Sequence, residues 1–192
     1  VYIASKMAFL EMALCGVTSV GEFHYLHRSA NGQPYNDANL LAKEVMRAAN
    51  DVGLRIALLR VAYERAGFQT EANPLQVRFI EQPESYLKNL EQLMSCKSDL
   101  VWVGAAPHSV RAVSLDYLKQ IDRFVKNSNI PIHMHVAEQP AEVSACIEEY
   151  GRSPVALLDT EGLLNRNFTA VHAIHVTPKA IQAIAKNNAN VC

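Results

Sequence analysis

Alternation of strand-like apolar runs with amphipathic helical segments is the feature that most constrains the fold of this chain. The runs occupy residues 17–23, 54–63, 100–106, 130–136 and 168–174, and Val191 begins another. Between them, apolar residues recur at helical spacing. Buried strands that are each followed by a helix are typical of a parallel sheet covered by helices. The pattern therefore predicts an α/β protein, either a barrel or an open doubly wound sheet.

The first helical segment, residues 3–14, spaces its apolar side chains along one face. These side chains are Ile3, Met7, Leu10 and Leu14. The segment is too short to cross a bilayer and carries charged residues, and we expect it to be an amphipathic helix of the domain. Gly53 and Gly151 follow later helical segments, where a glycine is expected to end a helix.

Polar residues whose side chains could take part in chemistry lie at the ends of several of the predicted strands. They are His24, Tyr63, His108, His135, Glu138 and His172. A barrel gathers the carboxyl ends of all its strands at one mouth, whereas an open sheet spreads them out. No glycine-rich phosphate turn follows any strand, which counts against a dinucleotide or nucleoside triphosphate site. We therefore favour the barrel.

The stretch from residue 130 to residue 139 combines a buried strand with a cluster of polar groups. Strand geometry places His133 and His135 on the face opposite to the apolar residues, and Glu138 follows before a helix that begins at Pro140. Histidine is a common zinc ligand, and a nearby glutamate that is not a ligand can move protons. Either histidine could instead be a hydrogen-bonded core residue, but the combination favours a functional site.

Composition narrows the class of protein. Hydrophobic residues make up 49% of the 192 residues and charged residues 19%, as expected of a globular domain with a core. The net charge of −1 without a basic stripe disfavours nucleic acid as a partner. The four cysteines (Cys15, Cys96, Cys146 and Cys192) are widely spaced and predict reduced thiols in the cytoplasm. No stretch predicts a membrane segment, and both ends of the chain suggest a piece of a longer protein.

Several phrases distributed along the chain carry a family resemblance. They are G-E-F-H-Y at residues 21–25, H-S-V-R-A-V at 108–113, H-V-A-E-Q at 135–139 and V-H-A-I-H at 171–175. Together they resemble the amidohydrolase superfamily and, within it, the formiminoglutamate deiminases. A histidine followed three residues later by a glutamate, with another histidine after the next strand, is specific only to the superfamily. The first three phrases taken together are much more specific. The resemblance covers essentially the whole chain, in order.

The resemblance implies a zinc-dependent (β/α)8 barrel that hydrolyses N-formimino-L-glutamate to N-formyl-L-glutamate and ammonia in histidine degradation. His135 would be a metal ligand, Glu138 would carry a proton to the departing nitrogen, and His172 would orient or help deprotonate the water. Residues matching substrate-binding positions are Tyr63, His108 and Arg111. These roles suit the chemistry, because zinc activates water, ammonia leaves only when protonated, and a guanidinium binds carboxylates.

Other readings of these residues stay open. Arg111 could form an exposed ion pair on a loop, and Tyr63 could pack at a strand end. His24 and His27 could line the mouth of the barrel. His133 is expected to be structural, and His175 is expected to support a ligand or lie at the surface.

The chain departs from the family pattern in its ligand set. The superfamily also uses a His-x-His pair from the first barrel strand and an aspartate from the eighth, and residues 1–192 contain neither. We therefore expect an incomplete barrel domain, roughly strands 2 to 6 with their helices, that binds zinc poorly and is inactive by itself. Its unpaired sheet edges would favour a homo-oligomer.

Two rival functions remain. One is another zinc deaminase of the superfamily that acts on guanine, cytosine or an adenosine derivative, which would need aromatic stacking. The other is a binding module without catalysis, whose histidines are only structural.

Overall fold

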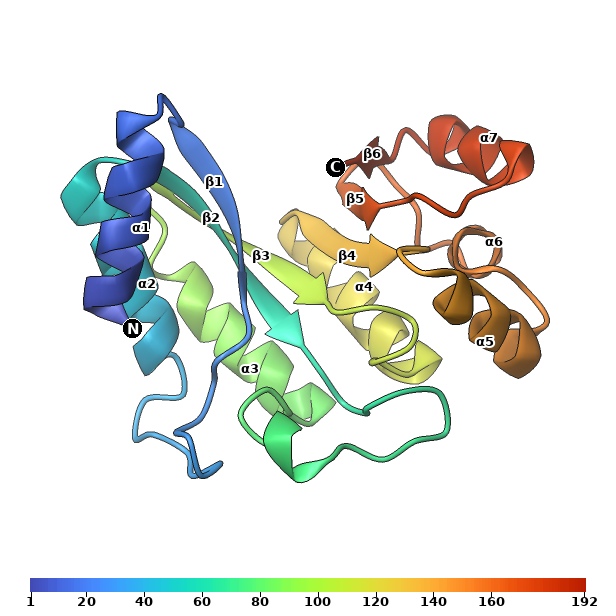
Figure 1. The fold of residues 1–192 in the computed structure, drawn as a ribbon, viewed down its shortest axis with the longest axis horizontal. Coiled ribbons are helices and arrows are strands. Elements are labelled where there is room, and N and C mark those ends of the chain that lie inside the picture. The colour runs from blue at the N-terminus through green and yellow to red at the C-terminus, as the bar shows by residue number, and fades with distance from the viewer.

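A curled sheet of six parallel strands organises the chain in the computed structural model, which describes residues 1–192 (Figure 1). The strands are β1 (Ser19–His24), β2 (Arg55–Ala62), β3 (Val101–Pro107), β4 (Ile132–Val136), β5 (Phe168–His172) and β6 (Asn190–Val191). Each strand pairs in parallel with the next strand in the sequence. A doubly wound sheet would reverse its strand order part-way. The prediction of a partial (β/α)8 barrel is confirmed.

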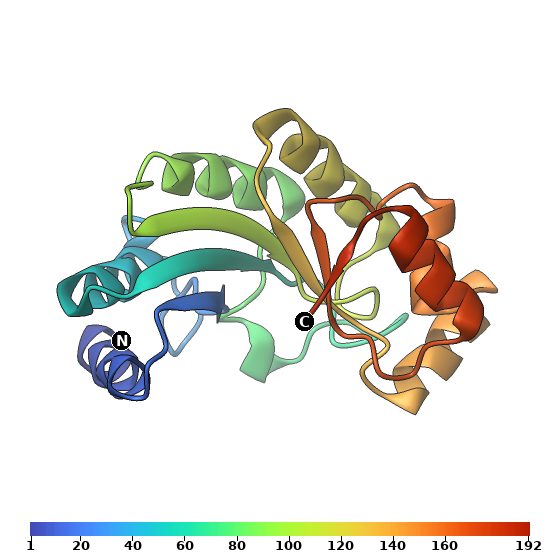
Figure 2. The ribbon, with the colours of Figure 1, turned by 90° about the horizontal axis from the view of Figure 1, so that it is seen from above.

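Helices cover the outer face of this sheet, as the view from above shows (Figure 2). They are α2 (Leu40–Val52), α3 (Pro83–Met94), α4 (Leu115–Ser128), α5 (Pro140–Tyr150), α6 (Pro154–Thr160) and α7 (Pro178–Lys186). The first helix, α1 (Tyr2–Leu14), packs on α2 at the edge of the sheet. Gly53 and Gly151 end α2 and α5 in the left-handed conformation, with φ of 82° and 68°. A glycine adopts this conformation without a steric penalty, and both predicted helix ends are confirmed. None of the helices is long and apolar enough to cross a membrane.

Alternation along the strands separates two apolar clusters. Ile56 and Leu58 of β2 belong to the main core between the sheet and its helices, which we call the outer face of the sheet. Leu59 and Val61 belong to a smaller cluster with Tyr63 on the concave side, the inner face. Side chains of the inner face therefore converge on one region, and this is where the polar residues at the strand ends meet.

A buried ion pair anchors the long loop that follows β2. Arg60 is fully buried on the outer face and pairs with Glu81, and its Nε donates to Oδ1 of Asn39 at 3.1 Å. Asn89 of α3 donates to the other oxygen of Glu81 at 2.7 Å. A buried charge is tolerated only when it is paired and hydrogen-bonded. The network fixes the end of the loop beside the strand from which the loop departs.

The predicted packing of the first helix is wrong. The expected buried face is exposed, with relative exposures of 80% at Ile3, 57% at Met7, 45% at Leu10 and 79% at Leu14. Only Phe9 of this helix is buried. The helix packs on α2 beside the edge strand β1, where no further strand lies beneath its apolar stripe. Helical spacing identifies such a stripe, but it does not identify what covers it.

Close packing at Gly104 yields a stability prediction. A Cβ at this position would lie 2.8 Å from Leu59 Cδ2 and 2.8 Å from the carbonyl oxygen of Pro131. We expect Gly104→Ala to lower the free energy of unfolding by about 1–3 kcal/mol, because a backbone atom cannot move aside. Urea denaturation followed by circular dichroism measures the change. Gly67→Ala is the control, since its Cβ would meet nothing closer than 3.8 Å; equal effects of the two variants would contradict the prediction.

Candidate active site

The strand β4 places its two histidines on the inner face of the sheet. Its burial alternates between buried and half-buried residues, and Met134 and Val136 lie in the core on the outer face. The ring of His135 lies 4.6 Å from that of Phe23, which packs against the inner-face cluster. The alternation predicted for this strand is confirmed.

His135 is held in the tautomer that a metal ligand needs. Its Nδ1 lies 3.1 Å from the backbone carbonyl oxygen of His108. A carbonyl oxygen only accepts hydrogen bonds, so Nδ1 carries the proton and Nε2 keeps a free lone pair. Burial lowers the pKa of His135 below its usual 6.5, which favours the neutral form. The hydrogen bond therefore orients the imidazole, and burial favours its neutral form with Nε2 free.

His172 and Glu138 lie beside His135 at the ends of neighbouring strands. Residues 136 and 172 are register partners in the β4–β5 pair, which brings the two strand ends together. Nε2 of His172 lies 3.7 Å from Oε1 of Glu138, and its ring centroid lies 5.2 Å from that of His135. Both side chains are about one-third exposed, at 33% for His172 and 39% for Glu138. The three side chains therefore lie together at the ends of β4 and β5.

The backbone around these groups is strained. Ala137, His172 and Ala173 have φ of 52°, 72° and 49°, in the left-handed region that side chains with a Cβ disfavour. Backbone hydrogen bonds from Ala173 N to the Val136 carbonyl at 3.0 Å and from His175 N to the Ala137 carbonyl at 2.9 Å join the two turns. Strain of this kind persists only where the surroundings impose it, and it is common at functional sites.

His108 and Tyr63 form an aromatic wall next to His135. The rings of His108 and His135 stack with centroids 4.8 Å apart, and Tyr63 meets His108 edge-on at 4.9 Å. Nδ1 of His108 lies 2.9 Å from Oγ of Ser109. Burial, reinforced by the nearby His135 and Arg111, lowers the pKa of His108 to about 3. His108 therefore stays neutral and can hydrogen-bond a ligand without carrying charge.

Arg111 is tied to the same region through its backbone and its side chain. Its Nη1 donates to the Ala66 carbonyl at 2.9 Å, and it forms no ion pair. Arg65 fixes the Arg111 loop by donating from Nε to the Arg111 carbonyl at 3.0 Å and from Nη2 to the Val110 carbonyl at 3.1 Å. Arg111 is therefore not paired with a carboxylate on an exposed loop, and its remaining N–H groups are available to an anion.

Comparison with known proteins shows the family of this chain. A family model described as "Amidohydrolase family" matches residues 1–192. The chain belongs to the amidohydrolase family.

Individual relatives show how much of the family fold this amidohydrolase chain represents. Formimidoylglutamate deiminase of Pseudomonas aeruginosa is 34% identical over 183 residues, which are 94% of this chain and 40% of that protein. A crystal structure of an amidohydrolase from Brucella melitensis superposes with a TM-score of 0.88 at 33% identity and covers 98% of this chain and 44% of that chain. An adenosine deaminase from Xanthomonas campestris with bound zinc shares the fold, with a TM-score of 0.78 at 21% identity, over 97% of this chain and 37% of that chain.

The donor set of this amidohydrolase chain fits part of a metal site. His135 presents a free Nε2, and the imidazoles of His108 and His172 lie beside it, with ring centroids 4.8 Å and 5.2 Å from that of His135. No group of three or more His, Cys, Asp or Glu side chains is arranged to hold a metal ion. A structural zinc site uses four ligands and a catalytic site three. His135 fits the role of one ligand, and the residues described here do not complete the set.

Sequence reasoning left the placement of two histidines open and missed two aromatic residues. His24 and His27 do not line the mouth, because they lie buried on the outer face near Arg60, with Nε2 of His27 2.8 Å from the Val61 carbonyl. Phe23 and Tyr25 lie on the inner face instead; the Tyr25 ring is 5.8 Å from that of His108, and burial raises the pKa of Tyr25 to about 12. Strand alternation places residues 23 and 24 on opposite faces of the sheet, but it does not say which of the two faces is the inner one.

The remaining two histidines have smaller roles. The ring of His133 lies edge-on to that of Phe23, with the two centroids 6.3 Å apart. His133 precedes His135 by two residues on the same face of β4. His175 is exposed and contributes its backbone N–H to the turn at Ala137.

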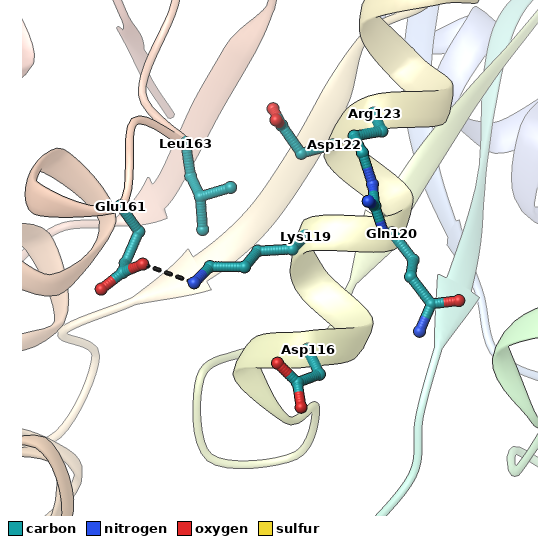
Figure 3. A pocket seen from close by; sticks show the side chains of 7 residues that line it. All are labelled: Asp116, Lys119, Gln120, Asp122, Arg123, Glu161 and Leu163. Atoms are coloured by element: carbon teal, nitrogen blue, oxygen red, sulfur yellow. Dashed lines mark ion pairs between the residues drawn. The ribbon is translucent and has the colours of Figure 1, made fainter.

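A surface hollow elsewhere on the molecule is not part of this site. It has a volume of about 570 Å³ and lies between α4 and the turn after α6, lined by Asp116, Lys119, Gln120, Asp122, Arg123, Glu161 and Leu163 (Figure 3). Lys119 pairs with Glu161 across it at 2.7 Å. Charges of both signs and the absence of any histidine make it a solvated groove between helices rather than a reaction site.

The buried His24 predicts an acid-sensitive fold. Burial and the nearby Arg60 lower its pKa from 6.5 to about 4. Between about pH 6.5 and pH 4, His24 is protonated in the unfolded chain but stays neutral in the folded protein. The free energy of unfolding therefore decreases as the pH falls through this range. We expect His24→Gln to reduce this loss by up to about 3 kcal/mol.

Urea denaturation of both proteins between pH 7.5 and pH 4 measures the difference in slope. His27 is retained in both proteins, so the lowering of its pKa by burial and by Arg60 is common to the two curves. Parallel stability curves for the parent and the variant would contradict the assignment.

Proposed function

We propose that the complete protein hydrolyses the formimino group of N-formimino-L-glutamate to give N-formyl-L-glutamate and ammonia. The observation that carries the proposal is the approach of Glu138 and His172 to His135, whose Nε2 is free. The identity of 34% to a formimidoylglutamate deiminase supports the choice of substrate.

Zinc is the proposed cofactor of the complete protein, as in the zinc-bound adenosine deaminase of the same fold. We propose that residues 1–192 are an incomplete barrel domain, since they span 40% of the Pseudomonas relative, and that His135 joins ligands from further strands. When bound, the metal supplies a Lewis acid that makes water nucleophilic near neutral pH.

The residues of this chain move the protons of the reaction. Water adds to the amidine carbon, and the Glu138 carboxylate accepts the proton that the attacking oxygen loses. Glu138 delivers this proton to the terminal nitrogen, which becomes an amino group. Glu138 then carries the proton of the new hydroxyl group to the same nitrogen, the bond from carbon to that nitrogen breaks as the carbonyl forms, and ammonia leaves with its electron pair. His172, 3.7 Å from Glu138, orients the water by hydrogen bonding. One water is consumed, and one formyl group and one ammonia are formed.

Arg111, His108 and Tyr63 hold the substrate in this proposal. The free N–H groups of Arg111 match a carboxylate of the glutamate portion, because a guanidinium binds a carboxylate through two parallel hydrogen bonds. Neutral His108 and the hydroxyl of Tyr63 supply uncharged hydrogen bonds beside it. Tyr63 is oriented by Gln76, whose Nε2 donates to the Tyr63 hydroxyl at 3.1 Å.

A second candidate is deamination of a ring such as that of an adenosine derivative. The aromatic group formed by Tyr25, Tyr63 and Phe79 favours it, with the Phe79 ring 5.8 Å from Tyr25 and 5.9 Å from Tyr63. Such rings could stack on a base. Ammonia release measured with N-formimino-L-glutamate, guanine, cytosine and adenosine derivatives separates the two. A metal-loaded protein that deaminates only a ring would overturn the first proposal, and one inert toward all of them would favour the binding module.

The role of Glu138 is tested by Glu138→Gln in the complete protein loaded with zinc. An amide keeps the shape of the side chain but cannot accept and return a proton. We expect kcat to fall at least about 100-fold, the scale of general acid–base catalysis, while KM changes little. Ammonia release from N-formimino-L-glutamate measures both constants. A variant with the kcat of the parent would remove Glu138 from the mechanism.

The role of Arg111 is tested by Arg111→Met. The variant keeps the length of the side chain and loses its charge, so we expect KM for N-formimino-L-glutamate to rise at least about tenfold through the loss of a charge-assisted pair. Lys119→Met on the distant groove between α4 and α6 is the matched control, and we expect it to leave KM unchanged. Equal KM values for the Arg111 variant and the parent would show that this arginine does not bind the substrate.

A further inference from the structure

Glu142 lies in the first turn of α5, but its carboxylate points back at the turn that carries Glu138. Its Oε2 accepts the backbone N–H of Glu138 at 3.0 Å, and its Oε1 accepts that of Ala137 at 3.2 Å. The residue is 8% exposed, so these bonds are shielded from water. One carboxylate thus binds two consecutive amides next to the proposed proton carrier.

The turn held in this way is one that the chain does not adopt without assistance. Ala137 has a φ of 52°, where its Cβ crowds the backbone, and an alanine left to itself favours negative φ. Reversion of Ala137 to negative φ would redirect the Cα–Cβ bond of the next residue, Glu138. The backbone N–H of His175 donates to the Ala137 carbonyl at 2.9 Å. Hydrogen bonds therefore fix both the N–H and the carbonyl of Ala137.

A carboxylate is suited to this task and an amide is not. Both oxygens of an ionised carboxylate are acceptors, whereas a glutamine side chain offers one acceptor and one donor group. The donor group of a glutamine would face an N–H. Burial raises the pKa of Glu142, and the backbone N–H groups and Arg111 oppose that rise by stabilising the ionised form.

We propose that Glu142 is a positioning residue: it holds Ala137 in the left-handed conformation and thereby aims the Glu138 carboxylate at His172 and the substrate. The inference rests on the proton-carrying role proposed for Glu138. It is distinct from the ordinary function of a glutamate in this position, which is to cap the helix and stabilise the fold.

Glu142→Gln in the complete, zinc-loaded protein separates positioning from capping. We expect kcat to fall about tenfold or more with a change in KM below about twofold, because a misdirected catalytic group slows chemistry more than binding. Adding Ala137→Gly to this variant should restore part of kcat, since glycine adopts positive φ without a penalty. Ala137→Gly alone should keep most of the parent kcat.

Asp37→Asn is the matched control for replacing a carboxylate that accepts a backbone N–H just before a helix. Oδ1 of Asp37 accepts the backbone N–H of Asn39 at 2.9 Å just before α2, away from Glu138. We expect it to lower thermal stability and leave kcat unchanged. A kcat for Glu142→Gln that falls no further than that of Asp37→Asn would overturn the proposal.

Backbone hydrogen exchange supplies a readout that does not depend on the substrate. We expect the amides of residues 137 and 138 to exchange faster in Glu142→Gln than in the parent, with the middle of α5 unchanged. If the parent releases no ammonia from N-formimino-L-glutamate but deaminates a ring, the substrate proposal fails and the same kcat comparison is made on the ring. If no substrate is turned over, the exchange rates alone decide. Unchanged exchange of amides 137 and 138 in Glu142→Gln would overturn the inference, whereas faster exchange confined to this turn would support the conclusion that Glu142 holds it in place.

Discussion

Parallel pairing of consecutive strands is the constraint on which the site depends. Because β3, β4 and β5 run in the same direction, their carboxyl ends lie side by side. His108, His135 and His172 lie at these three strand ends and are therefore brought together. The hydrogen bond from Nδ1 of His135 to the His108 carbonyl then crosses between two strand ends at 3.1 Å. The bond that selects the tautomer of His135 therefore depends on the sheet itself.

Charged side chains hold the loops and turns around the inner face in place. Arg60 and Glu81 fix the end of the loop after β2, Arg65 holds the backbone of the Arg111 loop, and Glu142 holds the turn before α5. Each of these groups is charged and bonded to backbone or to an opposite charge, which is how a buried ion avoids its desolvation cost. Polar groups that would weaken a core thus order the loops that carry the chemistry.

Sequence periodicity predicted much of the fold and less of the site. Strand and helix positions, the helix ends at Gly53 and Gly151, and the two faces of β4 followed from local patterns. The packing of α1 did not, because an apolar stripe does not name its partner. His24 and Phe23 show the same limit: they are adjacent in sequence, and only the curvature of the sheet decides which of them lies inside.

By itself, the sequence determined which residues share a face and which chemical groups follow each strand, because successive side chains of a strand point in opposite directions and glycine ends helices. Tertiary structure alone decided which face became the inner one, that Phe23 and His108 would pack against His135, and that Glu142 would reach back to Ala137 and Glu138. The reason is physical: local patterns arise from sterics within a few residues, whereas these contacts join strands and turns that meet only when the sheet curls.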